Sequence, residues 1–370
     1  MSYQEHIKRD TLVAFRGVKK TYDGEHLVVK HLDLDIERGE FLTLLGPSGS
    51  GKTTCLMMLA GFEFPTGGEI RLEGQLLNKV PPHKRNIGMV FQNYALFPHM
   101  TVAQNVAYPL SVRKVDSVTR AARVRRALDM VQMGKFADRY PAQLSGGQQQ
   151  RIALARALVF EPKLVLMDEP LGALDKQLRE HMQLELKALH QRLGLTFVYV
   201  THDQSEALTM SDRVAVFDQG VIQQLAEVDD LYEHPQNQFV AGFIGDNNRF
   251  SGTVAAVDGQ QCGMRLPDGS ILTGLNIGGA IPGQQVTACV RPERIRLVSG
   301  KEPANNVQNA LQATVSDLIY FGDHVRVRCA LQQQDDCFVK IALNDTALPE
   351  LRAGSRVVLG IEPDRLRVFN

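Results

Sequence analysis

The sequence has 370 residues, enough for two or three domains with hydrophobic cores of their own. Lysine plus arginine and aspartate plus glutamate both total 41, and this zero net charge argues against a nucleic-acid binder that works through bulk positive charge. The polar start MSYQEHIKRD lacks the apolar segment of a signal peptide, and no run of about 18 apolar residues indicates a membrane span. The five cysteines form no C-x-x-C pair, so we expect free thiols and a reducing, cytoplasmic location.

Two segments with the alternating pattern of β-strands, 12–18 and 27–36, open the chain. Asp23-Gly24 is a strong turn signal between them, which places Tyr22 at the tip of a loop. Such a tyrosine has two interpretations. It is only solvated, or it stacks on a purine base, a contact that needs nothing but an aromatic face.

The segment 46–54, GPSGSGKTT, fits the spacing G-x-x-x-x-G-K-[ST] of a phosphate-binding loop. An apolar run at 41–45 precedes it and a helix-forming segment at 53–60 follows, so a helix N-terminus should lie beneath the phosphates. Glycines let backbone N–H groups curl around phosphate oxygens, Lys52 would add a charge at the β- and γ-phosphates, and Thr53 would ligate Mg²⁺. The residues expected to hold the nucleotide are Gly46, Pro47, Ser48, Gly49, Ser50, Gly51, Lys52, Thr53 and Thr54.

Cys55 lies near the N-terminus of the same predicted helix, where the helix dipole favours a thiolate. A buried and inert thiol is the alternative.

An apolar run at 87–91 ends at Gln92. A glutamine there is commonly only a polar exit from a strand, but after a phosphate loop it also suits a ligand of Mg²⁺ or a residue that orients the attacking water. Residues 93–140 begin as a loop-rich stretch broken by Pro98 and Pro109, and continue as an arginine-rich helix over 118–131. That helix is simply solvated, or it reports the nucleotide state to another protein.

A second glycine-rich turn, LSGGQ at 144–148, precedes a helical pattern. Ser145 suits an N-cap, so this segment also offers a helix N-terminus to a phosphate, with a flexible hinge as the alternative. One chain therefore has two such helix ends.

A buried strand at 163–168 ends in the acidic pair Asp168-Glu169. Such an acid often only caps the next segment. Beside a phosphate loop, Asp168 would hold Mg²⁺ through water and Glu169 would polarise the attacking water. An apolar stripe over 174–193 then predicts a core helix with Gly194 as C-cap.

The next buried strand, 195–200, is followed by His202, and Asp203 and Glu206 have the spacing of a capping box. A histidine in this position is more often structural. Ligands nevertheless bind outside the carboxyl ends of strands in open α/β sheets, so Gln92, the acidic pair and His202 should converge on the phosphate loop.

The helical signal stops past about Asn237, and short alternating strands from Arg249 onward indicate a small β-barrel. Segment 290–297 (VRPERIRL) matches 361–368 (IEPDRLRV) position by position, which predicts two similar β units.

In their order, GPSGSGKTT, Gln92, LSGGQQQR, LVLMDEP, the segment ending in Asp175 and Thr201-His202-Asp203 resemble the full motif set of an ABC transporter ATPase subunit. The resemblance covers about residues 10–240, and LSGGQ is a signature that other phosphate-loop proteins lack. The C-terminal part resembles the tandem barrel-like, TOBE-type regulatory domain of bacterial importers. The stretch FQNYALFPHMTVAQNVAYPL is most similar to polyamine (spermidine/putrescine) importer ATPases, although ferric iron, sulfate, thiamine and sugar importers look much alike there.

The resemblance implies an α/β phosphate-loop ATPase domain at 1–240, with a helical subdomain at about 93–155, followed by an all-β, OB-like domain at 241–370. It implies ATP and Mg²⁺ as cofactors, and ATP hydrolysis coupled to solute uptake through a membrane permease. The expected partners are a second copy, permease subunits and, indirectly, a solute-binding protein, with no nucleic acid. The expected location is the cytoplasmic face of the bacterial inner membrane, without insertion.

Two subunits of this family pair head to tail, which implies that Ser145, Gly147 and Gln148 of one copy cover the ATP held by the other. Asp175 would then lie at the dimer contact, and His202 would contact the γ-phosphate. Gly172 stands where a serine is frequent before Ala-Leu-Asp, a departure that affects only a side-chain hydrogen bond.

Two rival functions remain. A ligand-sensing switch would hydrolyse nucleotide only incidentally. An ABC ATPase acting on ribosomes or DNA would normally carry two cassettes or a long coiled-coil insertion, and this sequence shows neither.

Overall fold

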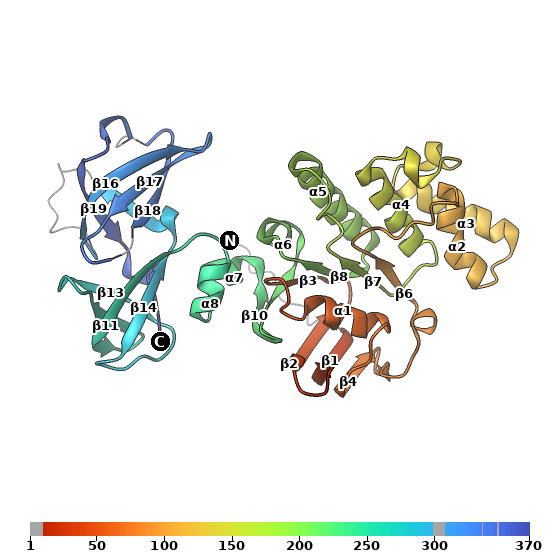
Figure 1. The fold of residues 1–370 in the computed structure, drawn as a ribbon, viewed down its shortest axis with the longest axis horizontal. Coiled ribbons are helices and arrows are strands. Elements are labelled where there is room, and N and C mark those ends of the chain that lie inside the picture. The colour runs from red at the N-terminus through yellow and green to blue at the C-terminus, as the bar shows by residue number, and fades with distance from the viewer. Residues whose placement is uncertain (1–9, 299–307, 335, 346–347) are drawn as a thin grey trace. The chain divides into compact units, whose positions relative to one another are not determined.

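The computed structural model describes residues 10–298, 308–334, 336–345 and 348–370. These residues form two compact units, of which the first ends at Leu231 and the second begins at Tyr232 (Figure 1). In the described part of the chain, no helix has both the length and the apolar character that a membrane crossing requires.

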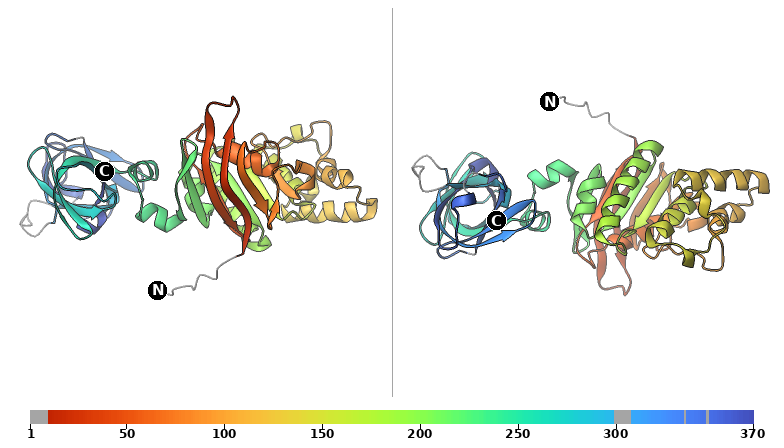
Figure 2. Two further views of the ribbon diagram at one scale, coloured as in Figure 1. Left: turned by 90° about the horizontal axis from the view of Figure 1, so that it is seen from below. Right: turned by 90° about the horizontal axis from the view of Figure 1, so that it is seen from above.

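The first unit is built on a ten-stranded sheet in the order β5-β4-β1-β2-β10-β9-β3-β8-β7-β6. Figure 2 shows this unit from two opposite sides. Strands β9, β3, β8, β7 and β6 run parallel, whereas β1, β2, β4 and β5 form an antiparallel group. Every residue of β3, β7 and β8 is buried, as expected for parallel strands covered on both faces. The strands are β1 (Thr11–Thr21), β2 (Leu27–Glu37), β3 (Phe41–Leu45), β4 (Gly67–Leu72), β5 (Gln75–Leu76), β6 (Ile87–Val90), β7 (Leu164–Asp168), β8 (Thr196–Thr201), β9 (Arg213–Asp218) and β10 (Val221–Glu227).

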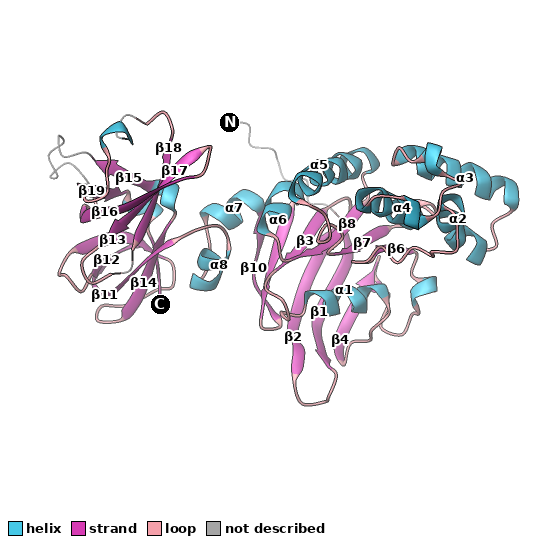
Figure 3. Cartoon of the chain, turned by 45° about the horizontal axis from the view of Figure 1, so that its top comes forward, coloured by secondary structure: helices cyan, strands magenta, loops and turns pink. Residues whose placement is uncertain are grey.

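Alternate side chains of the parallel strands enter two separate cores. On β7, Leu164 and Leu166 pack with the residues of α1 (Lys52–Ala60), which also contacts β2 and β8. Val165 and Met167 point into the opposite core with α4 (Gly146–Leu158) and α5 (Lys176–Leu193). Figure 3 shows these helices against the sheet. The helices α2 (Val102–Val112) and α3 (Ser117–Met130) pack beside α4, and α6 (Gln204–Met210) follows β8.

One predicted loop is a helix. The stretch before the arginine-rich helix contains α2, and Pro109 lies inside it. Thr101 and Gln104 form a capping box, and Val102, Val106 and Leu110 are fully buried at helical spacing. The prediction of a loop was wrong because a buried apolar stripe with a good cap outweighs the loss of one backbone hydrogen bond at a proline.

The second unit contains a closed barrel, β11-β12-β13-β20-β14, and a five-stranded sheet, β15-β19-β16-β17-β18. Each copy of the repeated segment forms a strand, a 3₁₀ turn and a further strand, which confirms the predicted echo. The last strands are exchanged between the two sheets: β15 pairs with β19, and β20 pairs with β14. The strands are β11 (Asn248–Asp258), β12 (Gln261–Arg265), β13 (Ile271–Asn276), β14 (Gln285–Val290), β15 (Ile295–Val298), β16 (Leu311–Tyr320), β17 (His324–Ala330), β18 (Cys337–Ala342), β19 (Arg356–Ile361) and β20 (Arg367–Phe369).

Helical structure does not stop at Asn237, contrary to the prediction. After α7 (Val228–Glu233), Asn237 caps α8 (Gln238–Phe243) by accepting a hydrogen bond from the Val240 N–H at 2.9 Å. The helix has only six residues, which is too short for a clear periodic pattern.

Glu40 is a buried acid at the start of β3. It is 1% exposed, its Oε2 accepts the Glu37 N–H at 2.6 Å, and its Oε1 lies 3.3 Å from Arg213 Nη1. Burial raises the pKa of Glu40 from 4.5 to about 7, against the opposing effect of those two contacts.

We expect Glu40 to make folding pH-dependent. Because the folded pKa lies above the unfolded value, the unfolded chain loses this proton first, so stability falls between pH 4.5 and about 7. The loss is at most about 3 kcal/mol. The melting temperature of Glu40→Gln should therefore rise relative to that of the wild type as pH rises through this range. The same replacement at the exposed Glu180 is the control. An equal wild-type-minus-variant difference at both ends of the range would contradict this account.

Candidate functional site

The glycine-rich loop joins β3 to α1 in a conformation that only glycine tolerates. Gly49 has φ of 80° and Gly51 has φ of 104°. A Cβ atom on Gly46 would lie 2.2 Å from the carbonyl oxygen of Phe217 on β9. The loop is thus tightly seated against the neighbouring strand, with its backbone leading directly into the N-terminus of α1.

Lys52 is folded back into this loop. Its Nζ donates to the carbonyl oxygens of Gly46 and Pro47, both at 2.8 Å, and lies 3.3 Å from Ser50 Oγ. The side chain is 5% exposed, and burial lowers its pKa, while the carboxylates of Glu169 and Asp168 act in the opposite direction. The positive charge of Lys52 is therefore bound by carbonyl oxygens of the loop itself.

Thr53 and Asp168 supply two adjacent oxygen ligands. Thr53 Oγ1 donates to Asp168 Oδ1 at 3.0 Å, which joins the first turn of α1 to the end of β7. Burial raises the pKa of Asp168, and the hydrogen bond from Thr53 lowers it. Hydroxyl and carboxylate oxygens beside a phosphate loop are the donor set that Mg²⁺ prefers, so these residues fit that ion.

Glu169 lies between the other two predicted polar residues. Its Oε2 accepts a hydrogen bond from Gln92 Nε2 at 3.3 Å, and its Oε1 lies 3.1 Å from His202 Nδ1. These residues follow β6, β7 and β8, which are adjacent in the sheet. Glu169 has φ of 44°, a left-handed conformation that is uncommon outside glycine and that concentrates at functional sites. The structure thus brings together the three side chains that the sequence expected at one sheet edge.

Tyr22 lies in the turn between β1 and β2, with 60% of its surface exposed. Its hydroxyl is 3.5 Å from Thr54 Oγ1 on α1, and Lys20 Nζ lies 4.7 Å from the centre of its ring. The aromatic ring is therefore exposed beside the helix that follows the phosphate loop.

The LSGGQ segment begins α4, where the Ser145 N–H donates to Gln148 Oε1 at 3.0 Å. Ser145, Gly147 and Gln148 line a hollow of about 310 Å³ together with Leu178. Within the described residues, no hydrogen bond or ion pair links these three residues to the loop 46–54. Within this part of the chain, the N-termini of α1 and α4 therefore share no polar contact.

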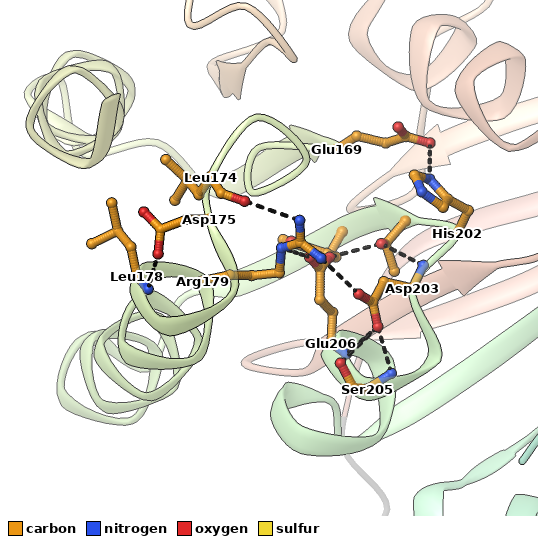
Figure 4. A network of polar contacts seen from close by, with 11 residues as sticks. Glu169, Leu174, Asp175, Leu178, Arg179, His202, Asp203, Ser205 and Glu206 are labelled. Carbon is orange, nitrogen blue, oxygen red and sulfur yellow. Dashed lines mark hydrogen bonds and ion pairs between the residues drawn. The ribbon is translucent and has the colours of Figure 1, made fainter. Parts of the chain in front are cut away.

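Asp175 caps α5, because its Oδ1 accepts the Leu178 N–H at 2.9 Å. The predicted capping box at α6 is only half formed. Asp203 caps the helix, but the Glu206 carboxylate turns inward to the hydroxyls of Tyr199 and Thr201, at 2.8 and 2.7 Å. Neither this inward carboxylate nor Arg179, which lies 3.9 Å from it, has a signal in the sequence pattern (Figure 4).

Cys55 is 1% exposed, and burial raises its pKa to about 12. The thiolate hypothesis was therefore wrong, since the helix dipole does not compensate for the missing water, and the buried inert thiol is what the structure shows.

The parallel strands β3, β8, β7 and β6 carry a phosphate loop after β3 and polar residues after the other three. This arrangement defines a phosphate-loop nucleoside triphosphatase. The ABC transporter family model matches residues 29–172, and the TOBE domain model matches residues 288–369. The chain belongs to the ABC transporter family, as an ATPase subunit with a C-terminal TOBE domain.

Its relatives match nearly the whole chain. The spermidine/putrescine import ATP-binding protein PotA of Pseudomonas fluorescens is 46% identical over 364 residues, 96% of each chain. The protein of that name in Rubrobacter xylanophilus is 49% identical over 316 residues, 85% of this chain and 82% of the relative.

Several solved structures resemble part of the chain, and two of them are described here. One is the dimeric post-hydrolysis state of the ATP-binding cassette MJ0796 bound to ADP and Pi, with a TM-score of 0.53, 35% identity, and coverage of 59% of this chain and 99% of that one. The other is cbiO1 from Clostridium perfringens, with a TM-score of 0.57, 26% identity, and coverage of 61% and 92%. The expected ATPase fold with a C-terminal TOBE domain is confirmed.

We expect thiol reagents to modify Cys55 in the folded chain only very slowly. The rate should be the same with and without ATP and Mg²⁺. All five cysteines are buried, so labelling followed by peptide mass mapping should detect modification only after denaturation. Rapid labelling of the Cys55 peptide that ATP slows would contradict a buried thiol.

Proposed function

We propose that this ATPase drives the import of spermidine and putrescine through a membrane permease. The proposal is supported by relatives named for that import, which are 46–49% identical over most of this chain. ATP hydrolysis, the part of the proposal that the geometry carries, is supported by the position of Glu169, held between Gln92 and His202 at the sheet edge that carries the phosphate loop.

The phosphate loop would bind the β- and γ-phosphates through the N–H groups of residues 46–54 and the N-terminus of α1. The charge of Lys52 already lies in the loop before ATP arrives, because its Nζ binds two loop carbonyls. When ATP binds, Lys52 would exchange these bonds for bonds to phosphate oxygens. Tyr22 would stack on the adenine ring. Mg²⁺, held by Thr53, Gln92 and Asp168, would neutralise charge on the phosphates.

Glu169 would act as the general base for the attacking water. Its carboxylate is oriented on one side by the Gln92 amide and on the other by the His202 ring. His202 is 56% exposed in its side chain, so its ring remains available to the γ-phosphate. The two neighbours would therefore orient the base and the phosphate at the same time.

A second copy of the chain would complete the site. In the part of the chain that the structure describes, Ser145, Gly147 and Gln148 make no hydrogen bond to the phosphate loop of their own chain, so we infer that they cover ATP bound by another copy, with Asp175 at the contact. The similar MJ0796 cassette, which is dimeric in its post-hydrolysis state, supports this arrangement. Loss of the γ-phosphate would then release the pair.

The remaining partners follow from the proposed transport. Permease subunits would receive the motion on the cytoplasmic face of the inner membrane, and a solute-binding protein would act indirectly. The helical segment after Gln92 is the proposed contact with the permease.

We expect Glu169→Gln to bind ATP but to hydrolyse it about 10²- to 10⁴-fold more slowly, because the amide keeps the shape of the base without its proton affinity. In ATP and Mg²⁺ this variant should elute as a dimer in size-exclusion chromatography. Adding Lys52→Ala to it should remove ATP binding and restore the monomer. A Glu169→Gln chain that binds ATP yet stays monomeric would contradict the shared site.

Uptake of labelled spermidine tests the transported solute. A strain lacking this gene should lose uptake, regain it with the wild-type chain, and fail to regain it with Glu169→Gln at equal expression. Thiamine, sulfate, ferric iron and sugar uptake are measured in parallel. Normal spermidine uptake in the deletion strain, with loss of another solute, would overturn the polyamine assignment and leave the ATPase assignment intact.

A further inference from the structure

One arginine joins two segments that have different roles in the proposed function (Figure 4). The segment that ends in Asp175 would meet the second copy, and the segment of His202 would meet the γ-phosphate bound by its own chain. Arg179, in the first turns of α5, donates through Nη2 to the carbonyl oxygen of Leu174 at 3.0 Å. Leu174 directly precedes Asp175. Through Nη1 the same guanidinium pairs with Asp203 Oδ2 at 3.2 Å, and Asp203 directly follows His202.

The two carboxylate oxygens of Asp203 have separate partners. Oδ1 accepts from the Ser205 N–H at 2.8 Å and from the Ser205 hydroxyl at 2.7 Å, which caps α6. Oδ2 is thereby oriented toward Arg179. Capping alone needs no charge, because asparagine caps helices as well as aspartate does. The negative charge is needed for the arginine.

Glu206 lies beside the same guanidinium (Figure 4). This residue is 2% exposed, and its carboxylate accepts hydrogen bonds from Tyr199 and Thr201 on β8. Its Oε1 lies 3.9 Å from Arg179 Nε, a buried N–H group that makes no hydrogen bond. A buried carboxylate and a buried donor this close attract each other, so a small movement of α5 toward Glu206 would close the contact.

We propose that Arg179 is a positioning residue that couples the Asp175 segment to the His202 segment. The inference rests on the proposed function, in which Asp175 meets the second copy and His202 meets the γ-phosphate of its own chain. Docking of the second copy would move the Asp175 segment, and Arg179 would transmit that movement to His202. Hydrolysis in one chain would then depend on contact with the other, which makes the ATPase cooperative.

Replacing Arg179 with methionine removes the guanidinium but keeps much of its stem. We expect ATP affinity measured on the isolated chain to change by less than about twofold, and kcat to fall about 10- to 100-fold, as for a displaced catalytic group. The cooperativity of the ATPase with respect to ATP should be lost. Arg179→Lys should recover part of kcat, because it keeps the charge beside Asp203 but not the second branch to Leu174.

Arg192→Met on the same helix is the matched control. Arg192 donates a hydrogen bond to the carbonyl oxygen of Met130, and among the described residues it has no hydrogen bond or ion pair with either segment. This control should keep both kcat and cooperativity. Equal losses in Arg179→Met and Arg192→Met would indicate a general effect on α5 and overturn the proposal.

A double-mutant cycle with Asp203→Asn separates coupling from folding, since asparagine retains the cap of α6. We expect Asp203→Asn to lower kcat and cooperativity, and the double variant to be no worse than Arg179→Met alone. Independent, multiplicative losses would overturn the proposal. A wild-type chain without ATPase activity would contradict the proposed function itself, whereas an active wild type with unaffected variants would contradict only the role of Arg179.

Discussion

Parallel pairing of β8, β7 and β6 is the constraint on which the site depends. In this register Asp168 lies opposite Val200, and Met167 lies opposite Val90, so the three strands end side by side. The residues that follow them necessarily leave the sheet at one edge. Glu169 can then contact Gln92 and His202 at once, although the three are far apart in the sequence. A slip of one residue in either pairing would turn the terminal side chain to the opposite face.

The residues around the phosphate loop also compensate buried charges by internal contacts. Lys52 and Asp168 are both largely buried, and burial disfavours the charged form of each. The cost of burying these charges is offset by the loop carbonyls that bind Lys52 and by the Thr53 hydroxyl that binds Asp168. Phosphate oxygens and Mg²⁺ would replace these contacts. The resting site therefore keeps its charges satisfied by internal contacts that a ligand can replace.

One guanidinium also organises the region behind the site. Arg179 donates to the Leu174 carbonyl oxygen, pairs with Asp203 and lies 3.9 Å from Glu206, so the segments that begin α5 and α6 share one guanidinium. A fork of planar N–H donors can bridge three groups in a way that a single ammonium cannot. In the second unit, strands and not a side chain join the two sheets: β15 pairs with β19 and β20 pairs with β14, so each repeated segment contributes a strand to the other sheet.

The sequence was enough to predict the class of fold, the strands around the phosphate loop and the edge on which Gln92, Glu169 and His202 meet, because these features depend on local spacing and on the direction of parallel strands. It did not reveal α2, where Pro109 hides a buried stripe, or the short α8, whose six residues carry no period. It also assigned Glu206 to a cap and left the state of Cys55 open. The role of Glu206 and the state of Cys55 became clear only in the folded chain, because hydrogen-bond partners such as Tyr199 and the loss of water around a thiol depend on how the whole chain packs.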